Sequence, residues 1–269
     1  MARIGAKRFL LDFISTRRLQ GEIVSALRAD DFVLHVQPEV DLASGQIVSA
    51  EALIRWNHIE RGLLPPSEFV PFAQEHGLLP SIDAWVVGEA AAAAALLRTI
   101  DPSFRVWFNV SPSELGDPRW LARIAQFGDS LHGLGVEITE SVAMRDVPGT
   151  LRTLDALKRA GLAIALDDFG TGYSSLAQLK RIPVDVVKLD RSFTAALPGD
   201  VRDREIVTAI LSIGARFGFE TVAEGIETAE QSRALREAGC RYGQGFYLGR
   251  PMPVDDLVRL MRQRCLMAS

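Results

Sequence analysis

Short apolar runs alternate with amphipathic stretches along most of the chain, and several of the apolar runs end in an acidic or amide side chain. This alternation predicts an α/β fold in which helices connect the strands of one sheet. Eight strands are predicted, near residues 32–40, 47–54, 104–110, 134–138, 162–167, 184–189, 219–224 and 241–247.

Helical patterns separate most of these strands. Only the turn-like ASGQ separates the first two, which is too short for a helical crossover, so that pair should be antiparallel. We therefore predict a TIM-like (β/α)8 barrel with one reversed strand. A doubly wound open sheet is the alternative, but it ordinarily carries a glycine-rich phosphate loop after the first strand, and the sequence shows none. The predicted helices lie near 81–98, 117–131, 147–160, 174–181, 201–217, 228–238 and 253–264, with Ser81, Asp117 and Thr228 as N-caps.

Carboxylates end strands that lie far apart in the sequence: Glu51, Glu137, Asp167, Asp168 and Glu224. A buried carboxylate without a partner is costly, and the carboxyl ends of barrel strands converge on one mouth. The pattern predicts one polyvalent cation site, for which hard oxygen ligands favour magnesium or manganese over zinc. Asp167 and Asp168 would face opposite ways in a regular strand, so a shared site requires the pleat to break there.

Composition narrows the class of protein. The chain has 269 residues, 48% of them apolar, with a formal charge of -4, which suits a soluble globular protein and argues against direct DNA binding. A nucleotide substrate stays compatible if metal ions bridge its phosphates. Cys240 and Cys265 are too few for a disulfide framework, so we expect buried or inert thiols in a reducing compartment.

The N-terminal sequence and the most apolar stretch of the chain lead us to expect a cytoplasmic protein. The N-terminus lacks the apolar core and cleavage site of a signal peptide. Residues 84–97 are interpreted as a buried or half-buried helix, too short to span a bilayer and interrupted by Glu89. We expect residues 1–19 to be an extension or linker, residues 20–265 to form the main domain, and no membrane segment.

An ordered set of motifs covers roughly residues 20–260: VQP, EALIRW, NVS, EITE, DDFGTGYSSL, KLDRSF, EGIET and QGFYLGRPMP. Together they resemble the EAL family of cyclic di-GMP phosphodiesterases. The resemblance implies a barrel that hydrolyses cyclic di-GMP to linear 5'-pGpG, with residues 20–265 as the phosphodiesterase domain. A non-catalytic cyclic di-GMP receptor or interaction module, and another metal-dependent barrel hydrolase, remain alternatives.

The resemblance also implies two Mg²⁺ or Mn²⁺ ions. Glu51, Asn109, Glu137 and Asp167 would hold one ion, while Asp167, as a bridge, would hold the second together with Asp168 and Glu224. Two divalent ions about 3.5 to 4 Å apart can neutralise a phosphodiester, activate water and stabilise the leaving alkoxide.

The same resemblance names four catalytic residues: Lys188, Glu224, Glu51 and Asp167. Lys188 would lie near the attacking water, and the alternative is a salt bridge to Asp190 or another carboxylate. The water would be activated mainly by metal, with Glu224 as a candidate base.

Substrate contacts are expected from Gln37, Leu53, Arg55 and Gln244. Glu51, Leu53 and Arg55 share strand parity, so Arg55 can approach a phosphate if Glu51 faces the mouth. A surface salt bridge for Arg55, and ordinary polar strand ends for Gln37 and Gln244, are the alternatives.

By resemblance Glu140 anchors the loop that begins at Gly170, and the alternative is a carboxylate placed at a helix N-terminus. A homodimer across the helix after this loop is expected. Glu227 is interpreted as a structural partner, the four histidines as non-catalytic, and the tryptophans as packing residues. Val36, Glu39 and Glu114 depart from the family pattern, Glu39 standing where an apolar residue is usual.

Overall fold

The computed structural model describes residues 18–143, 147–170 and 179–268. The chain forms two compact units, one from the residues up to Leu34 together with Ile54–Val86, and one from His35–Leu53 together with Val87 onward. The first is called the N-terminal unit below, and the second the barrel unit. The strands β1 and β2 and the helix α3 each run from one unit into the other.

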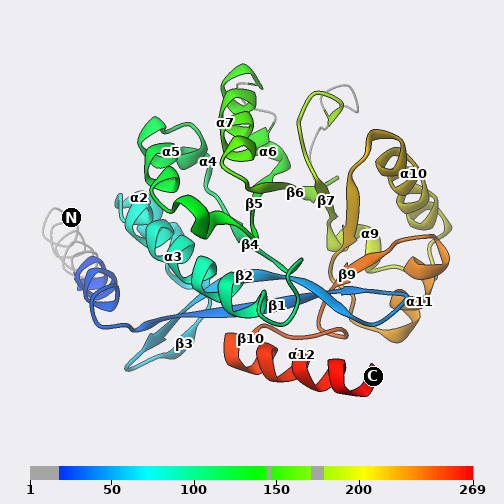
Figure 1. The fold of residues 1–269 in the computed structure, drawn as a ribbon, viewed down its shortest axis with the longest axis horizontal. Coiled ribbons are helices and arrows are strands. Elements are labelled where there is room, and N and C mark those ends of the chain that lie inside the picture. Colours follow the sequence, from blue (N-terminus) through cyan, green and yellow to red (C-terminus); the bar gives the residue numbers. More distant parts are fainter. Residues whose placement is uncertain (1–17, 144–146, 171–178, 269) are drawn as a thin grey trace, which may run out of the picture. The chain divides into compact units, whose positions relative to one another are not determined.

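The barrel unit carries the predicted closed sheet (Figure 1). Strands β2, β4, β5, β6, β7, β8 and β9 pair in parallel, each with the next in this order. Strand β1 pairs antiparallel with β9 and also pairs with β2, which closes the sheet. The prediction of an eight-stranded barrel with one reversed strand is confirmed, and the open sheet is excluded. The barrel strands are β1 Phe32–Asp41, β2 Ile47–His58, β4 Arg105–Asn109, β5 Leu134–Thr139, β6 Ala163–Phe169, β7 Val186–Leu189, β8 Glu220–Ala223 and β9 Tyr242–Gln244.

Helices connect these strands, as Figure 1 shows for α5, α7 and α10. Asp117 caps α5 by accepting from the backbone of Arg119, and Thr228 opens α11 with a capping box to Gln231, so both predicted caps are confirmed. Most of the helix predicted near 174–181 lies outside the described residues. The elements are α3 Leu79–Leu97, α4 Pro112–Leu115, α5 Pro118–Ala125, η2 Gly128–Leu131, α6 Glu140–Ala143, α7 Val147–Arg159, α9 Arg191–Thr194, α10 Val201–Phe217, α11 Ala229–Glu237, β10 Met252–Pro253 and α12 Val254–Ala268.

The N-terminal unit has its own aromatic core. Phe32, Trp56, Phe69 and Trp85 pack with ring centroids 5.4 to 5.8 Å apart. The unit also contains a helix over residues 18–26 and three short elements that the sequence pattern did not predict. Those elements are β3 Gly62–Leu64, η1 Pro66–Glu68 and α2 Val70–Glu75.

The helix α3 begins earlier than predicted. It starts at Leu79, so Ser81 lies inside the helix and is not its N-cap. Among the described residues it is the one helix that is long and apolar enough to cross a membrane, at 19 residues, by length and composition alone. The prediction that this stretch is too short to span a bilayer is therefore wrong. In the protein, 44% of the most apolar window of the helix is buried. The burial fits the predicted core or half-buried helix.

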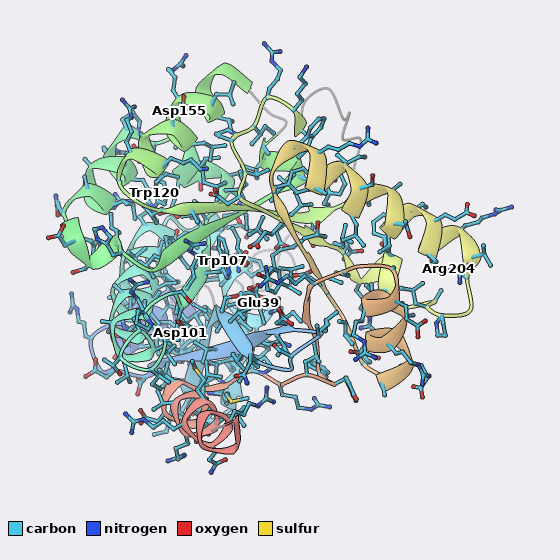
Figure 2. All side chains as sticks on the ribbon, turned by 45° about the vertical axis from the view of Figure 1, so that its right-hand side comes forward. Glu39, Asp101, Trp107, Trp120, Asp155 and Arg204 are labelled. Carbon is cyan, nitrogen blue, oxygen red and sulfur yellow. The ribbon has the colours of Figure 1, made fainter. Side chains whose placement is uncertain are left out.

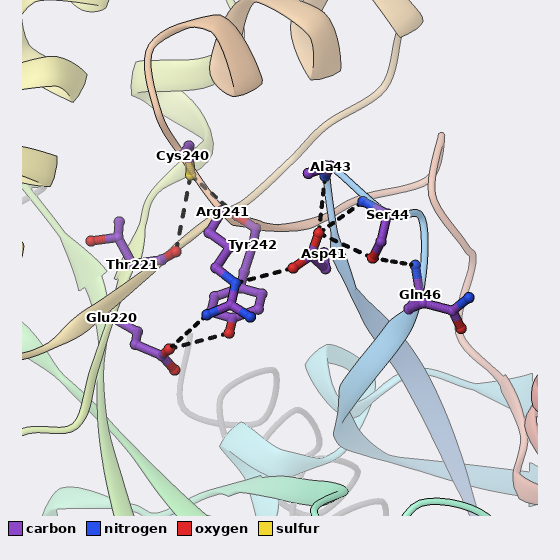
Figure 3. Close-up of polar contacts among 9 residues, drawn as sticks. All are labelled: Asp41, Ala43, Ser44, Gln46, Glu220, Thr221, Cys240, Arg241 and Tyr242. Carbon is purple, nitrogen blue, oxygen red and sulfur yellow. Dashed lines mark hydrogen bonds and ion pairs between the residues drawn. The ribbon is translucent and has the colours of Figure 1, made fainter.

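A network of polar side chains joins the end of β1 to the start of β9 at the base of the barrel (Figure 3). Asp41, at the end of β1, accepts hydrogen bonds from the backbone of Ala43 and Ser44 at 3.0 and 2.9 Å, and from Arg241 Nε at 3.0 Å. The backbone of Ser44, together with Arg241, holds the pKa of Asp41 below its ordinary value despite burial. One carboxylate therefore shapes the turn from β1 to β2 and ties it to β9.

The neighbouring thiol is buried, which fits the predicted buried or inert thiol. Cys240 is buried, its Sγ lies 3.2 Å from the carbonyl oxygen of Tyr242, and burial raises its pKa to about 12 (Figure 3). The side chain of Cys265 lies outside the described residues.

Replacing Asp41 by alanine is expected to lower the free energy of unfolding by about 1–2 kcal/mol at pH 7, because several hydrogen bonds at the turn are lost. Since the folded pKa lies below the unfolded one, this stabilisation is present above about pH 4 and is lost as the pH falls through the folded pKa. Urea unfolding at several pH values measures it. Asp41→Asn is the control, and an alanine deficit that persists unchanged well below pH 3 would contradict the assignment.

Candidate functional site

The carboxylate of Glu51 lies at the centre of the barrel mouth. Asn109 Nδ2, at the end of β4, donates to Glu51 Oε1 at 2.9 Å, and Gln244 Nε2, at the end of β9, donates to Oε2 at 2.8 Å. Parallel strands bring their carboxyl ends to one side of a barrel, and the single reversed strand does not disturb this. Three segments far apart in sequence therefore meet at one carboxylate.

The ammonium of Lys188, on β7, lies among three carboxylates. Its Nζ is 2.8 Å from Glu224, 2.9 Å from Glu137 and 3.4 Å from Glu51. Lys188 is only 1% exposed, so it is a buried cation inside the mouth. The alternative interpretation, a salt bridge to another carboxylate, is therefore observed, but within the predicted site.

Asp167 and Asp168 share the mouth because the strand breaks between them. Asp168 adopts a left-handed backbone with φ of 54°, and the β6–β7 register shifts between Leu166 and Phe169. The break therefore falls on Asp168 itself, and aspartate is among the few residue types besides glycine that adopt this left-handed backbone. Asp167, Asp168 and Glu224 consequently offer three carboxylate oxygens within 4.8 Å of one another.

This trio matches the ligands expected for the second ion. The carboxylates expected for the first ion, Glu51, Glu137 and Asp167, do not form such a group within the described ranges. Two of them instead contact the ammonium of Lys188. None of the described histidines joins a group that could hold a metal.

Burial and mutual repulsion shift the ionisation of these acids. Burial raises the pKa of Glu137 well above its ordinary value, and raises that of Glu224 to about 7, although Lys188 acts against both shifts. Burial acts in the same direction on Glu51, but Lys188, Gln244 and Asn109 outweigh it and hold the pKa of Glu51 below its ordinary value. The three carboxylates around Lys188 therefore differ in their affinity for protons.

Glu140 contacts the start of the loop that the sequence predicts. Its Oε2 accepts a hydrogen bond from the backbone of Gly170 at 2.8 Å, and the side chain is buried. Glu140 is also the first residue of α6. Its carboxylate therefore both contacts the start of the loop and lies at a helix N-terminus, the two positions that the sequence analysis considered. Residues 171–178 of the loop lie outside the described part of the chain, and the anchoring role stays a prediction.

The expected substrate residues occupy different positions. Gln37 and Gln244 line a cavity of about 190 Å³ at the mouth, together with Glu51, Glu224 and Phe246. Gln37 donates to the carbonyl oxygen of Gly249 at 3.1 Å. Leu53 is half-buried on β2. Arg55 belongs to the N-terminal unit, where its guanidinium donates to the carbonyl oxygen of Ile54, and its contact with substrate stays a prediction.

Two residues at the same cavity were not predicted. Arg191 lies beside Gly225, where a Cβ would meet its stem at 2.5 Å, and it pairs with Glu227 at 3.0 Å. This pair agrees with the prediction of Glu227 as a structural partner, which stays a prediction. Phe246 is half-exposed at the rim and lies under the guanidinium of Arg250. Its place two residues after Gln244, at the end of β9, was the available sequence signal.

The donor set suits a hard divalent cation. Each acid presents oxygen atoms: three carboxylates contact the ammonium of Lys188, and one of these, Glu224, also lies in a group with Asp167 and Asp168. Carboxylate and amide oxygens are typical ligands of magnesium and manganese. Larger hollows of about 580 and 630 Å³ lie elsewhere, but neither gathers a comparable set of ligands. The fold and the mouth thus define a barrel protein with an acidic site of the metal-binding type.

Comparisons with known proteins agree with this class. A family model described as EAL domain matches residues 20–251. The chain therefore belongs to the EAL domain family.

Two curated relatives come from Pseudomonas aeruginosa. The bifunctional diguanylate cyclase/cyclic di-GMP phosphodiesterase MucR is 40% identical over 246 residues, covering 90% of this chain and 36% of MucR. The cyclic di-GMP phosphodiesterase NbdA is 35% identical over 266 residues, covering 97% of this chain and 34% of NbdA. The chain thus spans about a third of the length of these curated relatives.

Solved structures agree in fold. A PaMucR phosphodiesterase in complex with c-di-GMP matches with a TM-score of 0.82 and 38% identity, over 89% of this chain and 99% of that one. The EAL enzyme Bd1971, in its cAMP- and cyclic-di-GMP-bound form, matches with a TM-score of 0.83 and 26% identity, over 93% of this chain and 70% of that one.

Proposed function

We propose that this chain is a metal-dependent phosphodiesterase that hydrolyses cyclic di-GMP to linear 5'-pGpG and so lowers second-messenger signalling. The observation that carries the proposal is the mouth itself, where the trio Asp167, Asp168 and Glu224 lies beside the buried ammonium of Lys188. Relatives at 35% and 40% identity that are named as cyclic di-GMP phosphodiesterases support the choice of substrate.

Charge balance supports two ions. When all five carboxylates at the mouth are ionised, they and the one ammonium leave four negative charges, which two divalent cations would balance. Mg²⁺ or Mn²⁺ would supply neutralisation of the phosphodiester and activation of water. The residues proposed to hold them are Glu51, Asn109, Glu137, Asp167, Asp168 and Glu224.

The protein groups then orient the reaction. Lys188 holds its ammonium beside Glu51 and Glu224, from where it can orient a water molecule and stabilise charge on the phosphate. Glu224 is the candidate acceptor of the proton that the water loses. Glu51 and Asp167 act by fixing the geometry of the mouth.

The cavity suggests how the dinucleotide sits. Its volume of about 190 Å³ is below the ~300–1,000 Å³ typical of whole-ligand pockets, so it would enclose only part of the substrate. Gln37, Gln244, Leu53 and Arg55 are the proposed contacts. The half-exposed ring of Phe246 at the rim offers a surface on which a guanine base can stack.

The remaining expectations belong to the same proposal. Residues 20–265 would form the phosphodiesterase domain after an extension at residues 1–19, and the domain would act in the cytoplasm as a homodimer. Glu140 supports the loop by its bond to Gly170. A receptor that binds cyclic di-GMP without cleaving it is the second candidate, because Lys188 contacts three of the carboxylates that are proposed to hold metal.

The test is chromatographic separation of nucleotides after incubating pure protein with cyclic di-GMP. We expect 5'-pGpG with Mg²⁺ or Mn²⁺, and none after chelation with EDTA. Unchanged substrate that nevertheless binds in an equilibrium dialysis experiment would favour the receptor. Cleavage that continues in EDTA would contradict the metal-dependent proposal.

A further inference from the structure

Thr194 carries a buried hydroxyl group that the proposed reaction does not use. It is the last residue of α9, the short helix that follows β7, and it is 0% exposed. Its Oγ1 lies 2.5 Å from the carbonyl oxygen of Glu224 and 3.1 Å from that of Arg191. A threonine hydroxyl has one proton to donate, and the nearer acceptor belongs to Glu224. Thr194 therefore binds the main chain of a residue at the mouth.

The main chain of Glu224 takes this partner at the point where its strand ends. The pairing of β7 with β8 ends at Leu189 and Ala223, and the next residue, Glu224, still donates its N–H to the carbonyl oxygen of Leu189 at 3.0 Å. The carbonyl oxygen of Glu224 accepts from Thr194 instead. Since Leu189 directly follows Lys188, one stretch of chain carries the ammonium and binds Glu224 through both its N–H and its carbonyl oxygen.

Further contacts hold α9 against the loop after β8. Arg191 packs so closely on Gly225 that a Cβ there would meet its stem at 2.5 Å, and its guanidinium pairs with Glu227 at 3.0 Å. Gln231 Nε2 donates to the carbonyl oxygen of Ala195, directly after the helix, at 3.3 Å. The helix and the loop are therefore packed together, with the hydroxyl described above buried between them.

The carboxylate of Glu224 lies at the meeting point of two groups. Its Oε1 is 2.8 Å from the ammonium of Lys188, and it offers an oxygen within 4.8 Å of those from Asp167 and Asp168. We propose that Thr194 is a positioning residue, whose hydroxyl fixes the backbone of Glu224 so that the carboxylate reaches both the ammonium and the two aspartates. The inference rests on the proposed metal-dependent function of the same mouth.

The chemistry of this bond predicts which replacement it tolerates. Serine keeps the hydroxyl and loses only a methyl group, so Thr194→Ser should preserve the bond to Glu224. Valine has nearly the same shape but no donor, so Thr194→Val leaves a buried carbonyl oxygen without this partner. The loop after β8 should then shift to bring that oxygen to another donor, and the carboxylate of Glu224 should move with it.

The experiment compares Mn²⁺ binding by isothermal titration calorimetry in the wild type, Thr194→Val and Thr194→Ser, with circular dichroism in EDTA to establish folding. We expect Thr194→Val to bind Mn²⁺ at least about 10-fold more weakly, the lower end of the loss that is typical when a group that orients metal ligands is removed. Thr194→Ser should stay close to the wild type, because it restores the hydroxyl.

Thr208→Val is the matched control. Thr208 Oγ1 donates to the carbonyl oxygen of Arg204 at 2.8 Å on α10, the helix on which Figure 2 labels Arg204. The substitution removes the same kind of bond from an exposed position outside the mouth. Thr208→Val should therefore retain wild-type affinity for Mn²⁺.

Each other outcome has a definite meaning. Wild-type affinity in a folded Thr194→Val protein, or equal weakening in Thr194→Ser or in Thr208→Val, would overturn the positioning role. If Thr194→Val does not fold, Thr194→Ala is compared with Thr194→Ser, because these two differ only in the hydroxyl, and equal affinities would overturn the role. A wild type that binds no Mn²⁺ at all would instead overturn the proposed metal-dependent function, and the positioning role with it.

Discussion

Turnover of cyclic di-GMP is expected to fall more than ~100-fold when Glu51 is replaced by alanine. Loss of a group that merely orients a metal ligand typically costs ~10–100-fold in affinity or activity, so loss of a ligand itself should exceed that range. Glu51 also accepts from Asn109 and Gln244 and contacts Lys188, so its removal releases three side chains of the mouth together. Initial rates of 5'-pGpG release at saturating Mn²⁺ measure the effect.

Glu237→Ala is the matched control, because this exposed carboxylate on α11 lies outside the site. It should retain wild-type turnover and melting temperature. Glu51→Ala should remain folded by circular dichroism and lose Mn²⁺ affinity in calorimetry. A folded Glu51→Ala protein that keeps more than a tenth of wild-type turnover would show that Glu51 is not a ligand.

The second large effect concerns stability. Replacing Lys188 by methionine should lower the free energy of unfolding of the metal-free protein by about 3–5 kcal/mol at pH 8, as expected when one partner of a buried ion pair is removed. Glu137 loses the contact at 2.9 Å that its carboxylate makes with the ammonium, and the part of the chain described here gives it no other hydrogen bond. Urea unfolding in EDTA measures the loss.

The pH dependence of this loss has a definite sign. Burial already raises the pKa of Glu137 above its unfolded value, and removing Lys188 raises it further. A carboxyl group of this kind carries no cost below its unfolded pKa of about 4.3, and its cost grows as the pH rises from there toward the folded pKa, above which it levels off. The deficit of Lys188→Met should therefore shrink on acidification, and saturating Mn²⁺ should also narrow it.

Lys158→Met provides the comparison for this variant. Lys158 pairs with Asp185 at 2.7 Å, but both side chains are about one-third exposed, and such pairs typically contribute no more than about 1 kcal/mol. Equal losses for the two lysine variants, or a Lys188→Met deficit that increases toward low pH, would show that Lys188 does not compensate buried negative charge.

Much of the architecture could be predicted because its signals are local. Apolar runs that end in carboxylates indicated both the strands and the edge at which they converge, and the short ASGQ turn indicated the reversed strand. The break of the pleat at Asp168 followed from the requirement that two adjacent acids face one site. Each of these inferences depends on residues that are close in sequence.

Side-chain partners were harder to predict, because they depend on how distant strands align. Gln244 meets Glu51 only because β9 pairs with β1 in the register that opposes Gln244 to Glu39. Arg191 reaches the cavity because Gly225, from another loop, leaves space for its stem. The earlier start of α3 at Leu79 places Pro80 within its first turn, where proline is tolerated and does not mark a break.

The position of Lys188 also bears on how the protein is made. Small zinc-dependent domains stay unfolded until their metal arrives, because nothing else compensates their ligands. Here an ammonium carried by the chain already contacts Glu51, Glu137 and Glu224. We therefore expect a newly synthesised copy to complete its barrel even in a cell that is short of divalent ions.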